Sequence, residues 1–124
     1  MSTRSVQIVG TGSFLPGEPI PNDRLEALLG PLNRAPPKVQ SFVNAFSPRM
    51  LERSGIQARH LAIDPETGHM THDFSGLAEV AARNALEMAG MAPTEIDLLV
   101  ISCPSYDYST PPTSAMLQER LGIE

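Results

Sequence analysis

Several features on which whole classes of protein depend are scarce in this 124-residue sequence. The single cysteine, Cys103, excludes an internal disulfide framework and a structural zinc site built from several thiolates. The aliphatic run Leu98–Ile101 is far shorter than the roughly 20 apolar residues of a membrane-spanning helix. The first residues carry no apolar run of the kind found in signal peptides. We therefore expect a soluble protein without a membrane partner, and the unpaired cysteine favours the cytoplasm.

Composition and charge indicate one globular domain that does not bind nucleic acid. Hydrophobic residues make up 41% and charged residues 19% of the chain, which is ordinary for a globular protein. The net charge is -5, but residues 1–62 carry seven Lys/Arg against four Asp/Glu, whereas residues 63–124 carry two against ten. No Lys/Arg stripe is interleaved with aromatic residues. The basic excess from Arg24 to Arg59 suits a phosphate or an acidic carrier protein, and it equally suits a solvated loop surface.

Hydrophobic spacing and turn residues predict an alternation of strands and helices. The clearest helix begins at Asp73 or Ser75 and ends at Ala89, before Gly90. The apolar run 96–103 is typical of a strand covered on both faces. The other predicted elements are a strand at 5–11, a proline-rich loop at 15–21, a helix at 22–29 capped by Asn22, a short helix around Val39–Phe46, a helical turn at 49–53 closed by Gly55, an extended segment at 57–62, and a final helix capped by Thr110 with Pro111 at its first position.

This order of elements predicts an α/β layered domain whose sheet is unfinished. The last predicted helix is followed by no further strand, so the sheet has few strands and an open edge. We expect that a second chain completes the sheet or that these residues are one part of a longer polypeptide.

Three small groups of residues have the chemistry for a site, but each also has a structural explanation. Gly10-Thr11-Gly12 follows a predicted strand as a dinucleotide-binding motif would, but it lacks the third glycine, so a tight structural turn is favoured. His69 and His72 could clamp a metal only together with further ligands, and the carboxylates of Asp64, Glu66 and Asp73 are nearby in sequence. Pro65 and Gly68 mark a loop there, so a solvated turn is favoured and no metal site is predicted. Cys103 ends a buried strand without a histidine in the loop that follows, which favours an inert thiol.

The loop after the 96–103 strand is the best candidate for the rim of a site. Asp107 lies between Tyr106 and Tyr108, and open α/β sheets bind ligands at the carboxyl ends of their strands. No catalytic residue can be assigned within the chain from these patterns.

Six segments in register resemble the beginning of a β-ketoacyl-acyl carrier protein synthase III, of the thiolase superfamily. Their order and spacing match nearly end to end, and only the stretch around 32–47 is longer, so residues 30–48 are interpreted as a family-variable insertion. The six segments are Ile8–Pro16, Asn22–Glu26, Glu52–Ala62, Ala81–Gly90, Ile96–Ile101 and Pro111–Gly122.

The resemblance implies a partial thiolase-like fold. Residues 1–124 match the first part of the N-terminal half of a five-layered αβαβα duplication, which would be incomplete alone. Such enzymes use a cysteine, a histidine and an asparagine to move an acyl group from coenzyme A and condense it, with decarboxylation, onto malonyl-acyl carrier protein. In the family's order all three residues lie beyond Glu124, and Cys103 does not match the nucleophile.

Two binding features carry over from the family by position. Arg53 matches an arginine that contacts the nucleotide part of coenzyme A, although it equally suits capping of the preceding turn. Arg49 stands where the family often has a tryptophan that stacks on adenine, which favours a donor on a carrier protein. The residues from Tyr108 to Pro111 match a loop that reaches the partner subunit's acyl pocket. In that loop Thr110 stands at a position where, in the family, a large aromatic side chain leaves room only for short acyl groups. The hydroxyl of Thr110 equally suits an N-cap of the last helix.

The resemblance thus implies a ketoacyl-synthase-III-like acyltransferase that acts only when the rest of the fold is present. Its expected partners are that remainder, a second copy in a homodimer and an acyl carrier protein. No resident cofactor is expected, because acyl-coenzyme A or carrier-bound phosphopantetheine is a substrate. The alternative is a non-catalytic, truncated thiolase-fold module that binds and modulates an intact synthase.

Overall fold

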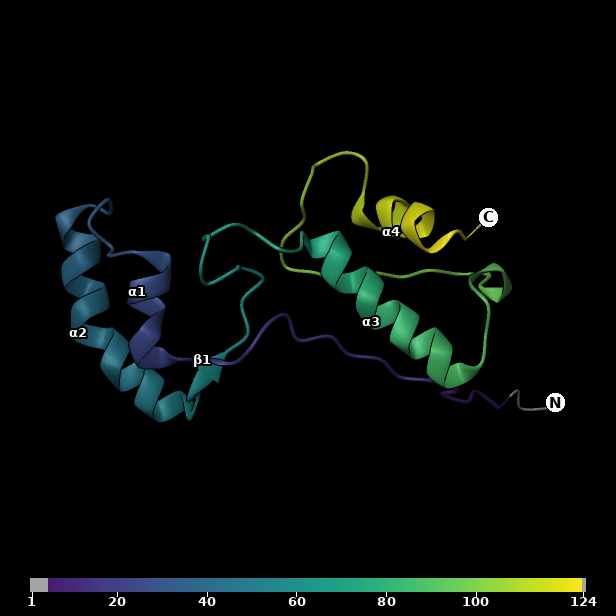
Figure 1. Ribbon diagram of the computed structural model, residues 1–124, viewed down its shortest axis with the longest axis horizontal. Coiled ribbons are helices and arrows are strands. Elements are labelled where there is room, and N and C mark those ends of the chain that lie inside the picture. The colour runs from purple at the N-terminus through teal and green to yellow at the C-terminus, as the bar shows by residue number, and fades with distance from the viewer. Residues whose placement is uncertain (1–4, 124) are drawn as a thin grey trace. The chain divides into compact units, whose positions relative to one another are not determined.

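A computed structural model describes residues 5–123 of the chain and divides them into two compact units (Figure 1). One unit runs from Pro16 to Thr71. The other combines the residues up to Leu15 with those from His72 onward. The two units differ in architecture and in the candidate residues that they carry.

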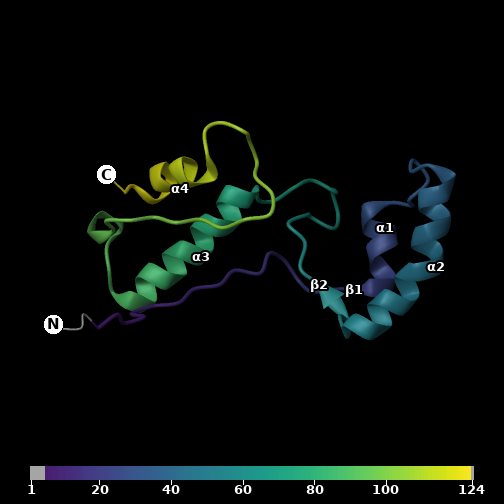
Figure 2. The same cartoon turned by 180° about the vertical axis from the view of Figure 1, so that it is seen from behind.

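Two helices and a minimal sheet form the Pro16–Thr71 unit. Strand β1 (Ile20–Pro21) pairs antiparallel with β2 (Ala58–Arg59), and Ile20 lies opposite Arg59. A 3-10 turn, η1 (Asn22–Arg24), leads into α1 (Leu25–Leu29), and α2 (Pro37–Ser54) lies beside α1 (Figure 2). β1 falls within the stretch predicted as a proline-rich loop. β2 confirms the extended segment predicted at 57–62.

Helix α2 is longer and more continuous than the sequence predicted. The short helix around Val39–Phe46 and the turn at 49–53 are one helix, because Pro37 takes the first helical position, where a missing N–H costs nothing. Pro48 lies inside the helix and removes one hydrogen bond without ending it. The predicted end at Gly55 is confirmed, since that glycine adopts the left-handed conformation with φ 68°.

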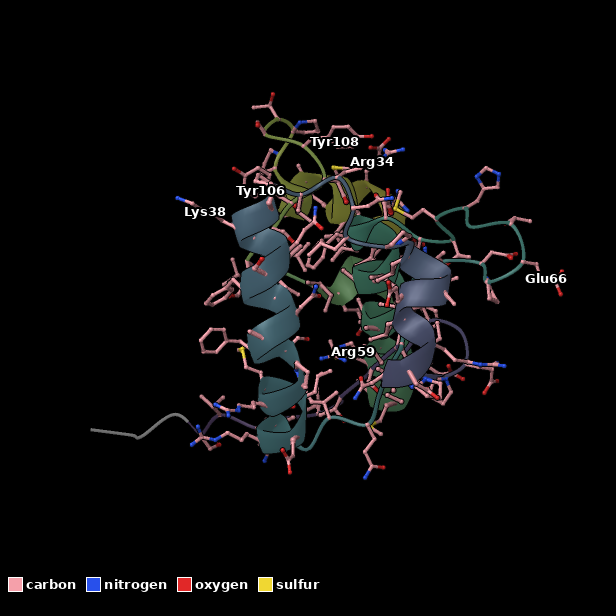
Figure 3. The ribbon with its side chains drawn as sticks, turned by 90° about the vertical axis from the view of Figure 1, so that its left-hand side faces the viewer. Arg34, Lys38, Arg59, Glu66, Tyr106 and Tyr108 are labelled. Atoms are coloured by element: carbon pink, nitrogen blue, oxygen red, sulfur yellow. The ribbon has the colours of Figure 1, made fainter. Side chains whose placement is uncertain are left out.

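The prediction that Asn22 caps a helix is wrong, because its side chain has stronger partners elsewhere. Its amide nitrogen donates to the carbonyl of Ile56, and its amide oxygen accepts a 2.6 Å hydrogen bond from Nη1 of Arg59 (Figure 3). The backbone N–H of Asn22 also donates to the carbonyl of Gln57. Asn22 therefore ties β1 to the segment that follows α2.

The second unit is organised around α3 (Phe74–Ala89), the helix that the sequence predicted most clearly. Asp73 caps its N-terminus by accepting a 2.7 Å hydrogen bond from the N–H of Gly76. Gly90 ends it in the left-handed conformation with φ 66°, as predicted. A 3-10 turn, η2 (Pro93–Glu95), follows. Among residues 5–123 no helix is both long and apolar enough to cross a membrane.

Helix α4 (Thr113–Leu121) packs on α3 and completes a small core. Its inward side chains Leu117 and Leu121 are 3% and 5% exposed. The prediction that Thr110 caps this helix with Pro111 at its first position is wrong, because Pro112 occupies the N-cap and no side chain caps the helix there. The predicted end at Gly122 is confirmed.

The two predicted strands of this unit, 5–11 and 96–103, are extended but unpaired, so both strand predictions are wrong for the described residues. A strand needs a hydrogen-bonding neighbour, and none of the described segments supplies one. Within 98–101 exposure still alternates with the period of a strand, because Leu98 and Val100 are 79% and 78% exposed whereas Leu99 and Ile101 are half-buried. The segment therefore packs one face and leaves an apolar face open.

Candidate functional site

A hollow of about 440 Å³ lies where the extended segment 96–103 passes into the loop before α4. Tyr106 and Tyr108 of this loop, which are labelled in Figure 3, both line the hollow. One hollow of the structure therefore lies at the rim that the sequence predicted at the end of the strand. The lining residues are Leu99, Val100, Ile101, Cys103, Tyr106, Tyr108, Ser109, Pro112, Thr113 and Ser114.

The carboxylate of Asp107 binds the N-terminus of α3. One oxygen accepts a 2.9 Å hydrogen bond from the N–H of Phe74. The other accepts from the N–H of Ser75 at 2.9 Å and from its hydroxyl. The interpretation of Asp107 as a ligand-binding group is thus replaced by a structural one, because both carboxylate oxygens already have partners.

The electrostatic setting keeps the Asp107 carboxylate ionised. The hydroxyl of Ser75 is the main cause that lowers the pKa of this carboxyl below its usual range, and the two helix N–H groups act in the same direction. Burial of the carboxyl opposes the shift, and the positive charge of Arg120 adds to it. A negative group at a helix N-terminus is also favoured by the helix dipole.

Cys103 lines the hollow as a half-buried free thiol. No described side chain hydrogen-bonds its sulfur, and no histidine lines the hollow with it. A thiol without a base is a weak nucleophile, and no described residue that lines this hollow supplies one, so the inert role of Cys103 stays a prediction.

The predicted acyl-pocket residues lie on one exposed loop. Tyr108 is 60% exposed and lines the hollow, whereas Thr110 and Pro111 are exposed and do not. The peptide between Thr110 and Pro111 is cis. Because Thr110 is not the cap of α4, the helix-capping alternative for this residue is withdrawn.

The two candidate binding arginines lie one turn apart on α2, in the Pro16–Thr71 unit. Residues four apart share a helix face, so Arg49 and Arg53 form a local positive patch. Both are exposed, and no described group forms an ion pair or hydrogen bond with either guanidinium. The capping of the last turn that was weighed for Arg53 is therefore not seen.

Gly10 and Gly12 serve a packing role, although in a different way from the expected tight turn. A Cβ on Gly12 would collide with the backbone carbonyl of Ala81 and the backbone N of Ala85. A Cβ on Gly10 would meet the Ala85 carbonyl and approach the Ala89 Cβ to 2.9 Å. The extended N-terminal segment thus lies directly against the backbone of α3.

The histidine-containing segment is a turn, as favoured from the sequence. Asp64 closes it by accepting hydrogen bonds from the N–H groups of Glu66 and Thr67, and Ile63 bridges to Met70. In the Pro16–Thr71 unit His69 is exposed. In the other unit His72 packs edge-on against Phe14 with ring centroids 5.1 Å apart. Residues 5–123 contain no group of three or more His, Cys, Asp or Glu side chains placed to hold a metal.

Sequence reasoning missed Ser75, the completely buried partner of Asp107. Two sequence features could have pointed to this pair: a serine in the first turn of the predicted helix that ends at Ala89, and an aspartate between two tyrosines. Nothing local connects residues 32 positions apart, so only the folded chain reveals the pair.

Comparison with known proteins covers nearly the whole chain but a minor part of its relatives. The chain is 34% identical over 121 residues to the β-ketoacyl-[acyl-carrier-protein] synthase III of Methylococcus capsulatus, which is 98% of this chain and 32% of that protein. It is 37% identical to the protein of that name from Rhodospirillum centenum and 38% identical to that from Bordetella petrii. These matches cover 99% and 94% of the chain, and 32% and 31% of the relatives. The chain thus spans about a third of the length of the curated relatives it matches. No family model matches it.

Solved structures with a similar fold also align with nearly the whole chain. The tetronic acid condensing enzyme AbyA1 aligns with a TM-score of 0.67 at 31% identity, over 94% of this chain and 32% of that one. The priming β-ketosynthase of the R1128 polyketide pathway aligns with a TM-score of 0.66 at 26% identity, over 95% and 29% of the two chains. OleA from Xanthomonas campestris, at 22% identity and a TM-score of 0.66, covers 94% of this chain and 31% of its own and supports the fold alone.

The structural matches give the chain a partial α/β thiolase-like fold, similar to part of the ketosynthases of the thiolase superfamily. In sequence it is similar to the N-terminal part of β-ketoacyl-acyl carrier protein synthase III proteins.

Proposed function

We propose that the chain is part of an acyltransferase that condenses an acyl group from coenzyme A or a carrier protein with a malonyl-type acceptor, in fatty acid or polyketide biosynthesis. The observation that carries the proposal is its similarity to synthase III proteins over 94–99% of its own length. The catalytic cysteine, histidine and asparagine belong, in this proposal, to sequence outside residues 1–124. The remainder of the fold, a second copy and an acyl carrier protein are the proposed partners.

The proposal assigns no resident cofactor, because the phosphopantetheine thioester is itself the substrate. It also places the reaction in the cytoplasm, where the free thiol of Cys103 is compatible with a reducing environment. A truncated module that only modulates an intact synthase is the competing function. Condensation by the native protein, with the acyl group carried by its own polypeptide, would exclude that competitor.

The proposed role of Arg53 is to bind the phosphate-bearing part of the donor. Its guanidinium is exposed, unpaired in the described structure and one turn from Arg49, which suits a charge-assisted contact with phosphate. Arg53→Ala should raise the KM for the donor by roughly tenfold or more while kcat changes little, since one such contact contributes about 1.5–3 kcal/mol. Steady-state kinetics of the native protein measure this effect.

Lys38→Ala is the matched control, because Lys38 is an exposed cation at the opposite end of the same helix. An equal rise in KM for both variants would indicate a general charge effect and contradict a specific contact by Arg53.

The proposed role of Thr110 is to leave room for long acyl groups. A small β-branched side chain replaces an aromatic one there, and each methylene newly buried is worth about 0.8 kcal/mol. Thr110→Phe should lower kcat/KM for long donors and retain it for the shortest. Donors of two to about twelve carbons measure the effect, and it is read as differences in kcat/KM.

Ser105→Phe is the control for this substitution, since Ser105 is exposed on the same loop but lies outside the Tyr108–Pro111 stretch that matches the family's acyl-pocket loop. Tyr106 and Tyr108, which do line it, are the side chains that can refill the space. An equal fall for every donor length would contradict the role of Thr110 in selectivity.

A further inference from the structure

The loop between the extended segment 96–103 and α4 has one point of attachment. Within the described structure, every side-chain hydrogen bond formed by residues 104–111 runs through the carboxylate of Asp107. The loop is otherwise exposed, and Tyr106 and Tyr108 are 64% and 60% exposed. Its conformation therefore depends on what holds Asp107.

What holds Asp107 is the first turn of α3, which includes a fully buried serine. Ser75, 0% exposed, gives both its N–H and its hydroxyl to the carboxylate, and Phe74 gives its N–H. The next two N–H groups of α3, those of Gly76 and Leu77, are taken by the side chain and the backbone carbonyl of Asp73. The first turn of α3 thus has no free donor, and Asp107 supplies half of the acceptors it needs.

A second set of contacts joins α4, the helix that follows the loop, to α3. Arg120 of α4 forms a 2.8 Å ion pair with Asp73, the residue that caps α3. The Arg120 carbonyl accepts a hydrogen bond from Nη2 of Arg83 on α3. The helix after the loop and Asp107 in the middle of the loop are thus both bound to α3.

The geometry points to Asp107 as a positioning residue that, through Ser75 and the first turn of α3, holds the 104–112 loop in place and so sets which acyl lengths the enzyme accepts. This inference rests on the proposed function, in which that loop borders the acyl chain. The tyrosines on either side of Asp107 both line the hollow, and Thr110 lies three residues further along the same loop. Loss of the hydrogen bonds between Asp107 and the first turn of α3 therefore changes the width of the hollow without removing any side chain that lines it.

The test compares Asp107→Ala and Asp107→Asn with Asp64→Asn in the native protein. The amide of Asn retains one acceptor oxygen, so its effect should be smaller than that of Ala. Asp64 is the matched control, because its carboxylate likewise accepts two backbone N–H groups but closes a turn in the Pro16–Thr71 unit. The ratio of kcat/KM for the longest accepted donor to that for acetyl-coenzyme A should shift by about tenfold in Asp107→Ala, less in Asp107→Asn, and not in Asp64→Asn.

If Asp107→Ala does not fold, Ser75→Ala takes its place in the test. This variant removes the hydrogen bond from the Ser75 hydroxyl to Asp107 and keeps the two from the backbone N–H groups of Phe74 and Ser75. It should shift the same ratio in the same direction by a smaller factor. A uniform fall in kcat/KM for all donor lengths, in either variant, would overturn the inference and leave Asp107 as a helix cap only.

Amide hydrogen exchange separates failure of this inference from failure of the proposed function. Exchange at Phe74 and Ser75 should be faster in Asp107→Ala than in the wild type, whether or not the protein condenses acyl groups. If the wild type condenses no donor, the proposed function fails and the selectivity role falls with it, whereas faster exchange still supports the attachment. Unchanged exchange at both amides would overturn the attachment itself.

Discussion

At the scale of single residues, small and acidic side chains decide how segments distant in sequence meet. Gly12 lies against the backbone of α3, where an added Cβ would meet the Ala81 carbonyl. Because that obstacle is backbone, it cannot rotate away. Overpacking of this kind typically costs about 1–3 kcal/mol.

Gly12→Ala should therefore lower the free energy of unfolding of the native protein by roughly that amount, about 1–3 kcal/mol. Ser13→Ala is the control, since it changes an exposed neighbour whose backbone carbonyl still accepts from Asn84. Urea unfolding monitored by circular dichroism measures both variants. Equal stability of Gly12→Ala and the wild type would mean that the N-terminal segment does not pack against α3.

Acid should weaken the protein through two carboxyls. The backbone N–H of Thr67, followed by that of Glu66, lowers the pKa of Asp64, and the Ser75 hydroxyl lowers that of Asp107. A carboxyl whose pKa is lower in the folded state stabilises the fold above its unfolded pKa of about 3.9, and this contribution is lost as pH falls through the folded value.

Stability should thus be retained from neutral pH to about 4.5 and should fall below about pH 4. Asp107→Asn removes one of the two groups, so the difference in unfolding free energy between it and the wild type should shrink below about pH 4. Unfolding curves from pH 7 to 2 measure this. A difference that stays constant over the whole range would contradict the ionised attachment.

Residue-scale predictions from sequence succeeded where the cause was local. Gly55 and Gly90 end helices because a left-handed residue is needed directly after the last turn, and that need is visible in the sequence. The roles of Asn22 and Asp107 were mistaken because their partners lie more than 30 residues away, beyond the reach of spacing rules.

At the scale of elements, helices could be predicted from sequence and strands could not. Helix α3 carries its own hydrogen bonds and its own cap, so its bounds follow from local chemistry. The segments 5–11 and 96–103 have strand composition, but their hydrogen-bonding partners are absent from the described chain. The composition of these two segments therefore predicts their extended backbone, but it does not predict which strand each of them pairs with.

The contact between α3 and α4 should carry much of the stability of its unit. Leu117 is the most buried hydrophobic residue described, so Leu117→Ala should cost about 2–5 kcal/mol, as large-to-small core substitutions do. Glu119→Ala, an exposed change on the same helix, should cost little. Thermal unfolding compares the two, and equal costs would show that α4 does not pack as described.

At the scale of the whole molecule, the chain exposes more apolar surface than a finished domain does. Val6, Ile8, Leu98 and Val100 are 94%, 86%, 79% and 78% exposed, and they lie on the two extended segments that lack partners. Surfaces of this kind mark an interface or an unstable edge. The chain also spans about a third of the length of the relatives that it matches.

The isolated 124-residue chain should therefore not be a stable monomer. Unpaired apolar segments favour association with other chains or aggregation. Sedimentation velocity over a range of concentrations measures this, and a monomer that unfolds cooperatively would contradict it.

The central claim, that the catalytic cysteine lies outside residues 1–124, is tested most directly by finding which cysteine becomes acylated. The native protein is incubated with a labelled acyl donor in the absence of the acceptor, and intact mass and peptide mapping then locate the acyl group. The label should lie on a cysteine outside residues 1–124, and Cys103→Ala should be acylated as fully as the wild type. Acylation of Cys103, or its loss in a folded Cys103→Ala variant, would contradict the account.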